Sequence, residues 1–285
     1  MSIPELLQQL TLEEKASLCS GGDFWHTKAI ERLGIPAMMM SDGPHGLRKQ
    51  DETGDHMGIN DSIKAVCFPA GCATASSFDR GLVERMGKAL GNECQAENVG
   101  VLLGPAVNIK RSPLCGRNFE YYSEDPLVAG KSGAAMVRGM QSEHIGASVK
   151  HFCCNNKETN RKDSDSRVSE RALREIYLKA FEIIVKEADP YTIMSSYNLI
   201  NGVQASENKD LLTGILRGEW DFKGMVTTDW WTHGEHYRET KAGNDIKMAN
   251  GYEERVQEAF EKGYITRDEI ALCAKRILTM ILRMD

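Results

Sequence analysis

The sequence predicts an α/β fold, a (β/α)8 barrel of the TIM type in which one or two strands are irregular. Short apolar runs alternate with longer amphipathic segments along the chain, which indicates parallel strands joined by helical crossovers. The length of 285 residues suits one such barrel, which typically takes about 250 residues. Polar or aromatic residues recur at one end of several predicted strands, where a barrel gathers its functional groups.

Five apolar runs are the clearest strand candidates. They are "PAMMMSD" (36–42), "GVLLGPAV" (100–107), "ASVKHF" (147–152), "YTIMSSYN" (191–198) and "GMVTTDW" (224–230). Strand-like runs at "ATASS" (73–77) and "DIKM" (245–248) are less regular. The charged, glycine-containing stretch 48–64 predicts a long surface loop over the barrel mouth.

Helices between these strands are indicated by apolar residues at helical spacing. The clearest helical pattern spans residues 169–188, with Ser169 as its N-cap. The last segment opens with a capping box formed by Thr266 and Glu269. Gly263, just before it, suits the end of the preceding helix.

An open, doubly wound sheet is the second candidate architecture. It would need a glycine fingerprint after its first strand, but "SDGPHG" (41–46) contains neither Gly-x-Gly-x-x-Gly nor a P-loop lysine. The predicted strands end instead on Ser41-Asp42, Lys150-His151, Tyr197-Asn198 and Asp229-Trp230. No repeat, low-complexity tract or linker divides the chain, so we expect residues 1–285 to form a single domain.

The composition indicates an ordinary soluble globular protein, with 41% hydrophobic and 27% charged residues. The net charge is -6 and basic residues are scattered, so we expect no nucleic-acid or membrane partner. The N-terminus shows no signal peptide, which predicts a cytoplasmic location. The eight cysteines form no Cys-x-x-Cys pair, so most are expected to be buried, reduced thiols. We expect no metal and no cofactor.

The residues at the strand ends together suit a carbohydrate ligand. Hydrogen-bonding groups come from Asp42, Arg117, Lys150, His151, Tyr197 and Asp229, and Trp230 and Trp231 add a flat apolar surface. An aspartate nucleophile is the chemistry of a retaining glycosidase, and Asp229 is the candidate. Each residue also has a purely structural explanation, as an N-cap, a rim ion pair or a packed aromatic. The residues alone therefore predict a barrel whose polar, aromatic-floored mouth binds a polyol-like ligand.

Five motifs resemble, in order and spacing, those of glycoside hydrolase family 3, the β-glucosidase family. They are "SDGPHGLR" (41–48), "GPAVNIKRSPLCGRNFEYYSEDP" (104–126), "KHFCCNNKETNR" (150–161), "MSSYNLING" (194–202) and "GMVTTDWW" (224–231). The resemblance covers essentially the whole chain and implies that Asp229 is the catalytic nucleophile. It also implies that the subsite of the non-reducing-end sugar is lined by Asp42, Arg117, Lys150, His151, Tyr197 and Trp230, with Met194 packed against it.

The general acid/base departs from the family pattern. Two-domain members resemble this chain over their first domain only and take a glutamate from a second α/β domain, which we expect to be absent here. Single-domain N-acetyl-β-glucosaminidases use an Asp-His pair on the loop after the Lys-His strand, but residues 153–168 contain no histidine. Substitutes from the sequence are Glu158, Asp163, Asp165, Glu235, His233 and His236, each of which also suits a solvated loop position. A partner chain is another source, and self-association through the face left by a missing domain is expected.

Two functions therefore stay in contention. The first is a retaining β-glycoside hydrolase whose acid/base residue is missing or non-standard, so that its activity is weak. The second is a non-catalytic or truncated sugar-binding barrel. The sequence does not decide between glucose, xylose and other sugars, although the missing loop histidine argues against N-acetylglucosamine.

Overall fold

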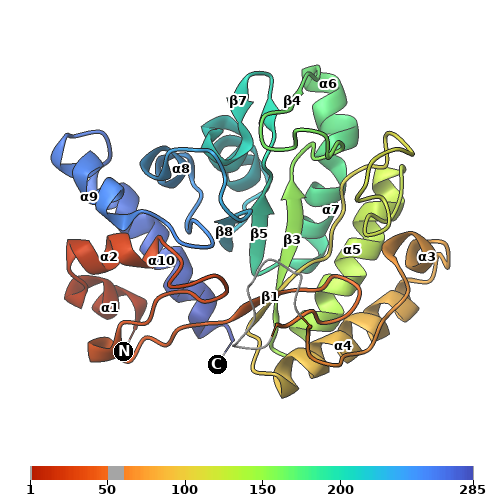
Figure 1. Cartoon of the computed structure of the whole chain (residues 1–285), viewed down its shortest axis with the longest axis horizontal. Coiled ribbons are helices and arrows are strands. Elements are labelled where there is room, and N and C mark those ends of the chain that lie inside the picture. Colours follow the sequence, from red (N-terminus) through yellow and green to blue (C-terminus); the bar gives the residue numbers. More distant parts are fainter. Residues whose placement is uncertain (1, 51–60, 285) are drawn as a thin grey trace.

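A computed structural model describes residues 2–50 and 61–284. Its centre is a five-stranded parallel sheet that curls into a half-barrel (Figure 1). The strand order is β1 (Met40–Asp42), β2 (Val101–Leu103), β3 (Gly146–Phe152), β5 (Thr192–Ser195) and β8 (Met225–Thr228). A second, small sheet comprises β4 (Asp165–Ser166), β6 (Leu199–Ile200) and β7 (Val203–Gln204), which lie in the segments that follow β3 and β5.

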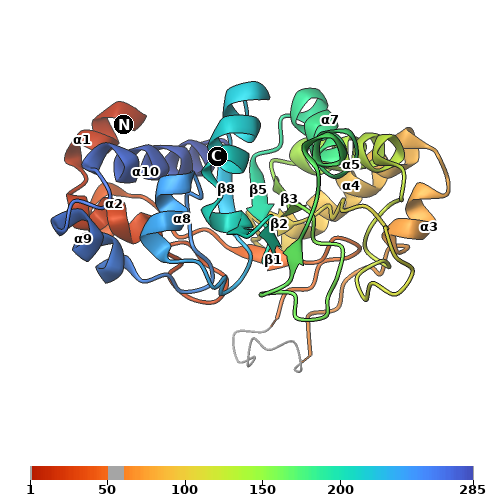
Figure 2. The same ribbon diagram turned by 90° about the horizontal axis from the view of Figure 1, so that it is seen from above.

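Helices flank the curled sheet and connect its strands. They are α1 (Ile3–Gln9), α2 (Leu12–Leu18), α3 (Gly71–Ala75), α4 (Arg80–Ala96), α5 (Pro126–Gln141), α6 (Glu170–Ala172), α7 (Lys179–Ala188), α8 (His236–Ala242), α9 (Glu253–Glu261) and α10 (Arg267–Leu282), with 3-10 turns η1 (Glu31–Leu33) and η3 (Ala205–Glu207) and π-helical segments η2 (Leu173–Tyr177) and η4 (Asp210–Glu219). Figure 2 shows α4, α5, α7 and α10 along one side of the sheet. In the described part of the chain, no helix combines the length and apolar character needed to cross a membrane.

The helix ends follow the signals in the sequence. The predicted capping box is confirmed, because the Thr266 side chain accepts the Glu269 N–H and the Glu269 carboxylate accepts the Thr266 N–H (2.8 Å). Gly263 adopts a φ of +74° just after α9, as expected of a C-terminal glycine. Asp125 caps α5 by accepting the Leu127 and Val128 N–H groups.

Close packing of α5 against α4 depends on small residues. A Cβ atom placed on Gly139 would lie 2.1 Å from the Glu84 carbonyl oxygen, so only glycine allows the two helices to approach this closely. Between β3 and α7, the rings of Phe152 and Phe181 pack edge to face with centroids 5.1 Å apart. These contacts fix the helical layer against the sheet, and with it the strand ends that carry the functional side chains.

The five clearest predicted strands are confirmed, although each is shorter than its apolar run, except β3. The fold is α/β with a curled parallel half-barrel, and the described residues do not form a closed eight-stranded barrel of regular strands. Residues 51–60 of the predicted 48–64 loop lie outside the described residues.

Two expectations about irregular strands need correction. Residues 73–77 are not a strand, because Gly71–Ala75 forms α3, where two alanines favour helix and the Thr74 hydroxyl bonds the Pro69 carbonyl oxygen (3.2 Å). Residues 245–248 form only isolated parallel bridges, Ile246 with Thr227 and Lys247 with Ser20.

The predicted helix over residues 169–188 is interrupted. Ser169 caps it as expected, but α6 passes into the π-helical segment η2 before α7 begins. At this point the Leu178 N–H bonds the Leu173 carbonyl oxygen, five residues earlier (2.8 Å). The extra residue rotates α7 relative to the apolar pattern read from the sequence.

All eight cysteines are free. Five of them are buried, as expected of structural thiols: Cys19, Cys94, Cys153, Cys154 and Cys273. Cys67 is exposed, and Cys72 and Cys115 are partly buried.

Candidate active site

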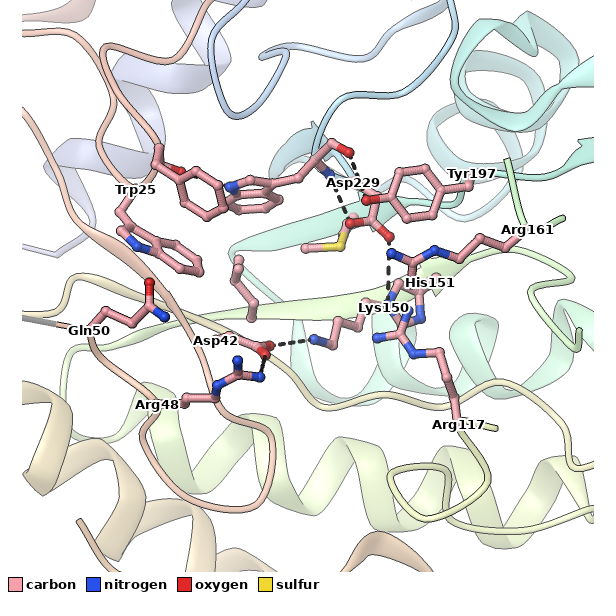
Figure 3. Close-up of a pocket in the computed structure, with 14 residues that line it drawn as sticks. Trp25, Asp42, Arg48, Gln50, Arg117, Lys150, His151, Arg161, Tyr197 and Asp229 are labelled. Carbon is pink, nitrogen blue, oxygen red and sulfur yellow. Dashed lines mark hydrogen bonds and ion pairs between the residues drawn. The ribbon is translucent and has the colours of Figure 1, made fainter. Parts of the chain in front are cut away.

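A cavity of about 280 Å³ lies at the C-terminal ends of the strands (Figure 3). Asp42 ends β1, Met194 lies in β5 and Asp229 directly follows β8. All eight residues that the sequence predicts for the sugar site line this one cavity: Asp42, Arg117, Lys150, His151, Met194, Tyr197, Asp229 and Trp230. The parallel order of the strands brings these distant segments to one edge of the sheet.

Lys150 and His151 show how the backbone re-aims side chains at this edge. Successive residues of a regular strand point to opposite faces, yet both of these line the cavity. The pairing of β3 with β5 shifts register between Val149 and Phe152, and Lys150 also bridges Ala106. The irregularity lets two adjacent side chains serve the same site.

Asp229 is held at the floor of the cavity. Its own N–H donates to the Ser195 carbonyl oxygen (3.1 Å), which extends the pairing of β8 with β5 by one residue. Its Oδ1 accepts the Trp230 N–H (2.8 Å). Its buried Oδ2 has no hydrogen-bond partner and lies 3.8 Å from His151 Nε2. One carboxylate oxygen is therefore anchored and the other is free.

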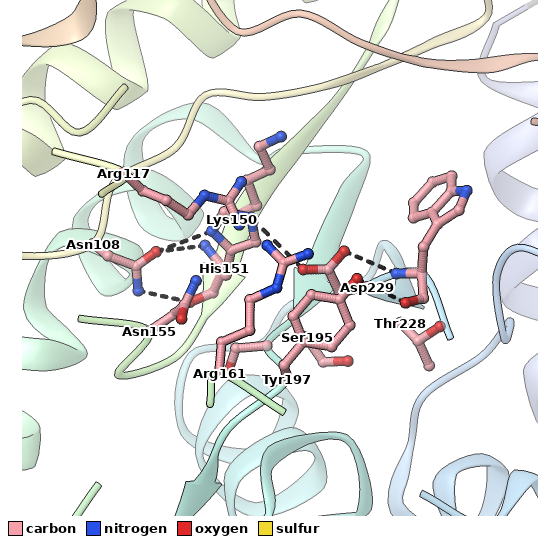
Figure 4. Close-up of polar contacts among 12 residues, drawn as sticks. Asn108, Arg117, Lys150, His151, Asn155, Arg161, Ser195, Tyr197, Thr228 and Asp229 are labelled. Carbon is pink, nitrogen blue, oxygen red and sulfur yellow. Dashed lines mark hydrogen bonds and ion pairs between the residues drawn. The ribbon is translucent and has the colours of Figure 1, made fainter. Parts of the chain in front are cut away.

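The electrostatic setting of Asp229 combines burial with surrounding cations. Burial raises the pKa of the Asp229 carboxyl above its ordinary value, and the positive charge of Arg117 and its neighbours offsets only part of that rise. Figure 4 shows the guanidinium groups of Arg117 and Arg161 on the same side of the carboxylate, toward His151. An anion here is poorly solvated by water and is held by fixed charges instead.

Asp42 is a second carboxylate of the cavity, but its setting is different. Lys150 Nζ donates to Asp42 Oδ1 (2.9 Å), and Arg48 Nη1 lies 3.8 Å from Oδ2. Burial alone would raise the pKa of Asp42, but Lys150 and the nearby arginines outweigh it and hold the pKa below its ordinary value. Asp42 is therefore an ionised hydrogen-bond acceptor at neutral pH, unsuited to donate a proton.

His151 is a neutral group in this setting. Burial, and then the positive charge of Arg117, hold the pKa of His151 well below its ordinary value. Asn108 fixes its backbone, since the Asn108 side chain accepts the His151 N–H (2.7 Å) and donates to the His151 carbonyl oxygen (2.8 Å). The imidazole can therefore hydrogen-bond a ligand without adding charge.

Two arginines frame the polar side of the site. Arg117, which is partly buried, forms an ion pair with the buried Glu120. Arg161 donates to Glu158 (Nη1 to Oε2, 3.1 Å), and its guanidinium lies 4.8 Å from the centroid of the Tyr197 ring. Each guanidinium is thus oriented by a carboxylate or a ring and presents its remaining N–H groups toward the cavity (Figure 4).

Aromatic residues form the apolar wall. The indole Nε1 of Trp230 donates to the Phe24 carbonyl oxygen (2.7 Å). The ring centroids of Trp25 and Trp230 lie 5.6 Å apart, and Trp231 contacts Phe24 edge to face at 5.1 Å. Trp231, which the sequence grouped with Trp230, does not line the cavity and is half exposed. The flat surface is therefore built by Trp230 together with residues of the N-terminal segment.

Six lining residues were missed by sequence reasoning: Phe24, Trp25, Arg48, Gln50, Leu103 and Arg161. Arg48 and Arg161 end two of the motifs singled out in the sequence, so their place in those motifs was an available signal. The aromatic pair in "GDFWH" (22–26) was a weaker one, because nothing in the sequence brings this segment next to Trp230.

None of the acid/base candidates among the carboxylates lines the cavity: Glu158, Asp163, Asp165 and Glu235. The carboxylate of Glu158 is paired with Arg161, which does line it. Asp165 pairs with Arg167 (Nε to Oδ2, 2.7 Å) and accepts the Gly202 N–H. These carboxylates orient loops after β3.

The candidates beyond β8 are equally remote from the chemistry. His233 bonds the exposed Asp163, a candidate from the segment after β3 (3.1 Å), and Glu235 lies 3.9 Å from Arg255. His236 is buried, where its Nδ1 accepts a backbone N–H. Among the described residues, no group of three metal-ligating side chains comes together either.

Comparison with known proteins identifies the family to which this chain belongs. The family model of the glycosyl hydrolase family 3 N terminal domain matches residues 20–280. Thermostable beta-glucosidase B of Acetivibrio thermocellus is 50% identical over 284 residues, 99% of this chain and 38% of that protein. An exo-alpha-(1->6)-L-arabinopyranosidase of Bifidobacterium longum is 47% identical, over 96% of this chain and 37% of that protein.

Solved structures agree with the sequence relatives. Beta-glucosidase 3B from Thermotoga neapolitana, solved in complex with alpha-D-glucose, superposes with a TM-score of 0.93 at 40% identity and covers 99% of this chain and 42% of its own. The beta-glucosidase from Kluyveromyces marxianus, in complex with glucose, gives a TM-score of 0.94 at 43% identity, over 100% of this chain and 34% of its own. The present chain thus spans less than half of the length of these relatives. The extent of these matches places the chain in glycosyl hydrolase family 3, as a member that corresponds to the N-terminal domain of its relatives.

Proposed function

We propose that this domain provides the sugar-binding and nucleophilic groups of a retaining β-glycoside hydrolase, with Asp229 as the nucleophile. The observation that carries the proposal is the state of the Asp229 carboxylate. Oδ1 is anchored by the Trp230 N–H, whereas Oδ2 is buried at the cavity floor without a hydrogen-bond partner. A free, poorly solvated carboxylate oxygen suits attack on an electrophilic carbon.

In the proposed reaction, Asp229 Oδ2 bonds to the anomeric carbon while the bond from that carbon to the leaving oxygen breaks. The leaving oxygen takes a proton from a general acid. Water then attacks the glycosyl–aspartate ester, gives up a proton to the same group and releases the sugar with retained configuration. The positive charge of Arg117 and its neighbours favours the ionised form of Asp229, against the effect of burial on its pKa.

The remaining lining groups suit a single pyranose ring. The Asp42 carboxylate accepts from neighbouring ring hydroxyls, and Lys150 and Arg117 donate charge-assisted hydrogen bonds worth about 1.5–3 kcal/mol each. Trp230 supplies an apolar face for the C–H groups of the ring. The relatives named above include a β-glucosidase and an α-L-arabinopyranosidase, and we propose a β-D-glucoside as the substrate.

The general acid does not come from the described lining residues. Asp42 is held ionised, and the other candidate carboxylates lie outside the cavity. Loss of acid catalysis typically lowers rates about 10²–10⁴-fold. We therefore expect weak activity of the 285-residue chain, restricted to aryl glycosides whose leaving groups need no proton, with alkyl glycosides and disaccharides far slower.

The same observation favours one alternative, a non-catalytic or truncated barrel that binds sugar. Binding of glucose or cellobiose by calorimetry, with no turnover of nitrophenyl glycosides and no covalent adduct, would support that alternative.

An activated 2-fluoro-glucoside tests the proposal. It should form a stable adduct on Asp229, detected by intact mass and peptide mapping, and Asp229→Ala should abolish it. Asp163→Ala is the control, because this exposed carboxylate lies outside the cavity and labelling should persist. No adduct, or an adduct on another residue, would refute the assignment of Asp229.

Three broader expectations go with this proposal. The isolated bridges from β8 to Ile246 and from Lys247 to Ser20 support an irregular completion of the barrel wall. Self-association of this chain stays a prediction, tested by light scattering at high concentration. The cytoplasmic location also stays a prediction, tested by fractionation of the source cells.

A further inference from the structure

Two buried polar atoms of the cavity wall have no hydrogen-bond partner, and the reaction proposed above does not use them. They are Nε1 of Trp25 and Oε1 of Gln50. Gln50 is only 4% exposed, so bulk water does not satisfy its carbonyl oxygen. Buried polar atoms are almost always paired in folded proteins, and an unpaired pair in a binding cavity indicates groups that a ligand completes.

The backbone of both residues is fixed by pairing with other segments. The Trp25 carbonyl oxygen accepts the Met40 N–H (2.8 Å), and its ring packs against Trp230. Gln50 forms an antiparallel bridge with Ser62. Figure 3 shows Trp25 and Gln50 on the side of the cavity away from Asp229, and Asp42 lower in the view, beside Arg48 and Lys150.

The chemistry of the two atoms selects a hydroxyl group. The indole N–H is only a donor and the carboxamide oxygen is only an acceptor. An ammonium group has no lone pair for the indole, and a carboxylate has no proton for the carboxamide. A hydroxyl accepts and donates at once, so a single hydroxyl that reaches both atoms satisfies both.

We propose that Trp25 and Gln50 bind the hydroxymethyl oxygen of the sugar and thereby favour hexopyranosides over pentopyranosides, an inference that rests on the proposed sugar site. With the anomeric carbon at Asp229 and ring hydroxyls at Asp42, a group that reaches Trp25 and Gln50, on the side away from Asp229, stands outside the ring. The hydroxymethyl group is the exocyclic arm of a hexopyranose. A pentopyranose lacks it and leaves both buried atoms unpaired, which disfavours its binding.

Calorimetry with the full 285-residue chain tests this contact. D-glucose should bind more tightly than 6-deoxy-D-glucose, which carries a methyl group in place of the hydroxymethyl, on the order of tenfold. Gln50→Met keeps the length of the side chain and removes its carboxamide, and Trp25→Phe keeps an aromatic ring but removes the indole N–H together with part of the ring system. Each should weaken glucose binding several-fold and leave 6-deoxyglucose binding nearly unchanged, so the preference shrinks toward unity.

The control is Gln95→Met, the same change on α4, where the side chain bonds the Glu143 carbonyl oxygen far from the cavity. It should leave the preference intact, and thermal melts should show that all variants fold. Equal losses for both sugars, or no loss for either, would overturn the proposed contact. If glucose binds and Asp229 is labelled while the preference stays unchanged, only this inference fails; if neither sugar binds, the sugar site fails with it.

Discussion

Replacing Asp229 with asparagine should stabilise the fold while it removes the proposed nucleophile. The residue is 8% exposed, and its Oδ2 lacks a hydrogen-bond partner. Asparagine has nearly the same shape, and its carbonyl oxygen can keep the bond from the Trp230 N–H (2.8 Å in the wild type). The substitution therefore changes the charge and little else.

The expected magnitude follows from two opposing effects. A buried polar atom without a partner costs about 1–3 kcal/mol, and more when it is charged. The amide nitrogen of asparagine would also lack a partner, so the substitution recovers only the extra cost of the charge. Attraction to the nearby cations offsets part of this cost, but the raised pKa of Asp229 indicates that the effect of burial is larger than this attraction. We expect the free energy of unfolding to rise by about 1–2 kcal/mol at pH 7. That gain corresponds to roughly 2–8 °C in Tm for a chain of this size.

The pH dependence provides a sharper test of the cause. A carboxyl group whose folded pKa lies above its unfolded value destabilises the fold once it ionises. The penalty is complete above the folded pKa and absent below the unfolded value of about 4. The advantage of Asp229→Asn over the wild type should therefore be largest at neutral pH and should shrink as the pH falls toward about 4.

Urea and thermal unfolding at pH 7 and pH 4 measure both quantities. The control is Asp163→Asn, whose side chain is 73% exposed and whose substitution should change stability by no more than about 0.5 kcal/mol. A variant less stable than the wild type at pH 7 would mean that the cations outweigh burial. The same gain at both pH values would show that charge is not the cause.

Two other buried groups give predictions that do not depend on the proposed activity. Arg217→Met should destabilise the chain by about 1.5–3 kcal/mol in urea titrations, because it removes one of two guanidinium partners of Asp245, a fully buried carboxylate. The other partner, Arg276, stays at 3.1 Å; no loss of stability would contradict this prediction. Burial lowers the pKa of His236 to about 4, while Cys19 and Tyr252 bond its two ring nitrogens. Stability should therefore fall as the pH drops from about 6.5 toward about 4, because the unfolded state binds the proton first, and His236→Gln should flatten this profile; an unchanged profile would show that another group is responsible.

Much of the site was predictable because motif residues sit where strands end. Asp42, Met194 and Asp229 each lie at or near the end of an apolar run, and parallel strands place such ends along one edge. The strand positions and their common direction were enough to predict Asp42 and Asp229, whereas Met194 came from the resemblance to glycoside hydrolase family 3. Neither prediction needed the identity of each neighbour.

The parts that sequence reasoning missed depend on irregular backbone. Alternation along a strand predicts opposite faces for Lys150 and His151, and only the register shift in β3 puts both in the cavity. The acid/base candidates failed for a related reason. Glu158 lies near the site in the sequence, but its carboxylate pairs with Arg161 and does not line the cavity.

The sequence by itself determined the α/β class, the five principal strands, the helix caps and eight of the fourteen residues that line the cavity, because these depend on local periodicity and on motifs. Tertiary structure alone decided that the regular sheet is a half-barrel, that residues 73–77 are helical and that Trp25 and Gln50 join the wall. These features depend on contacts between segments far apart in the chain. Local propensity carries no information about such contacts, so they could not be predicted from the order of residues along the chain.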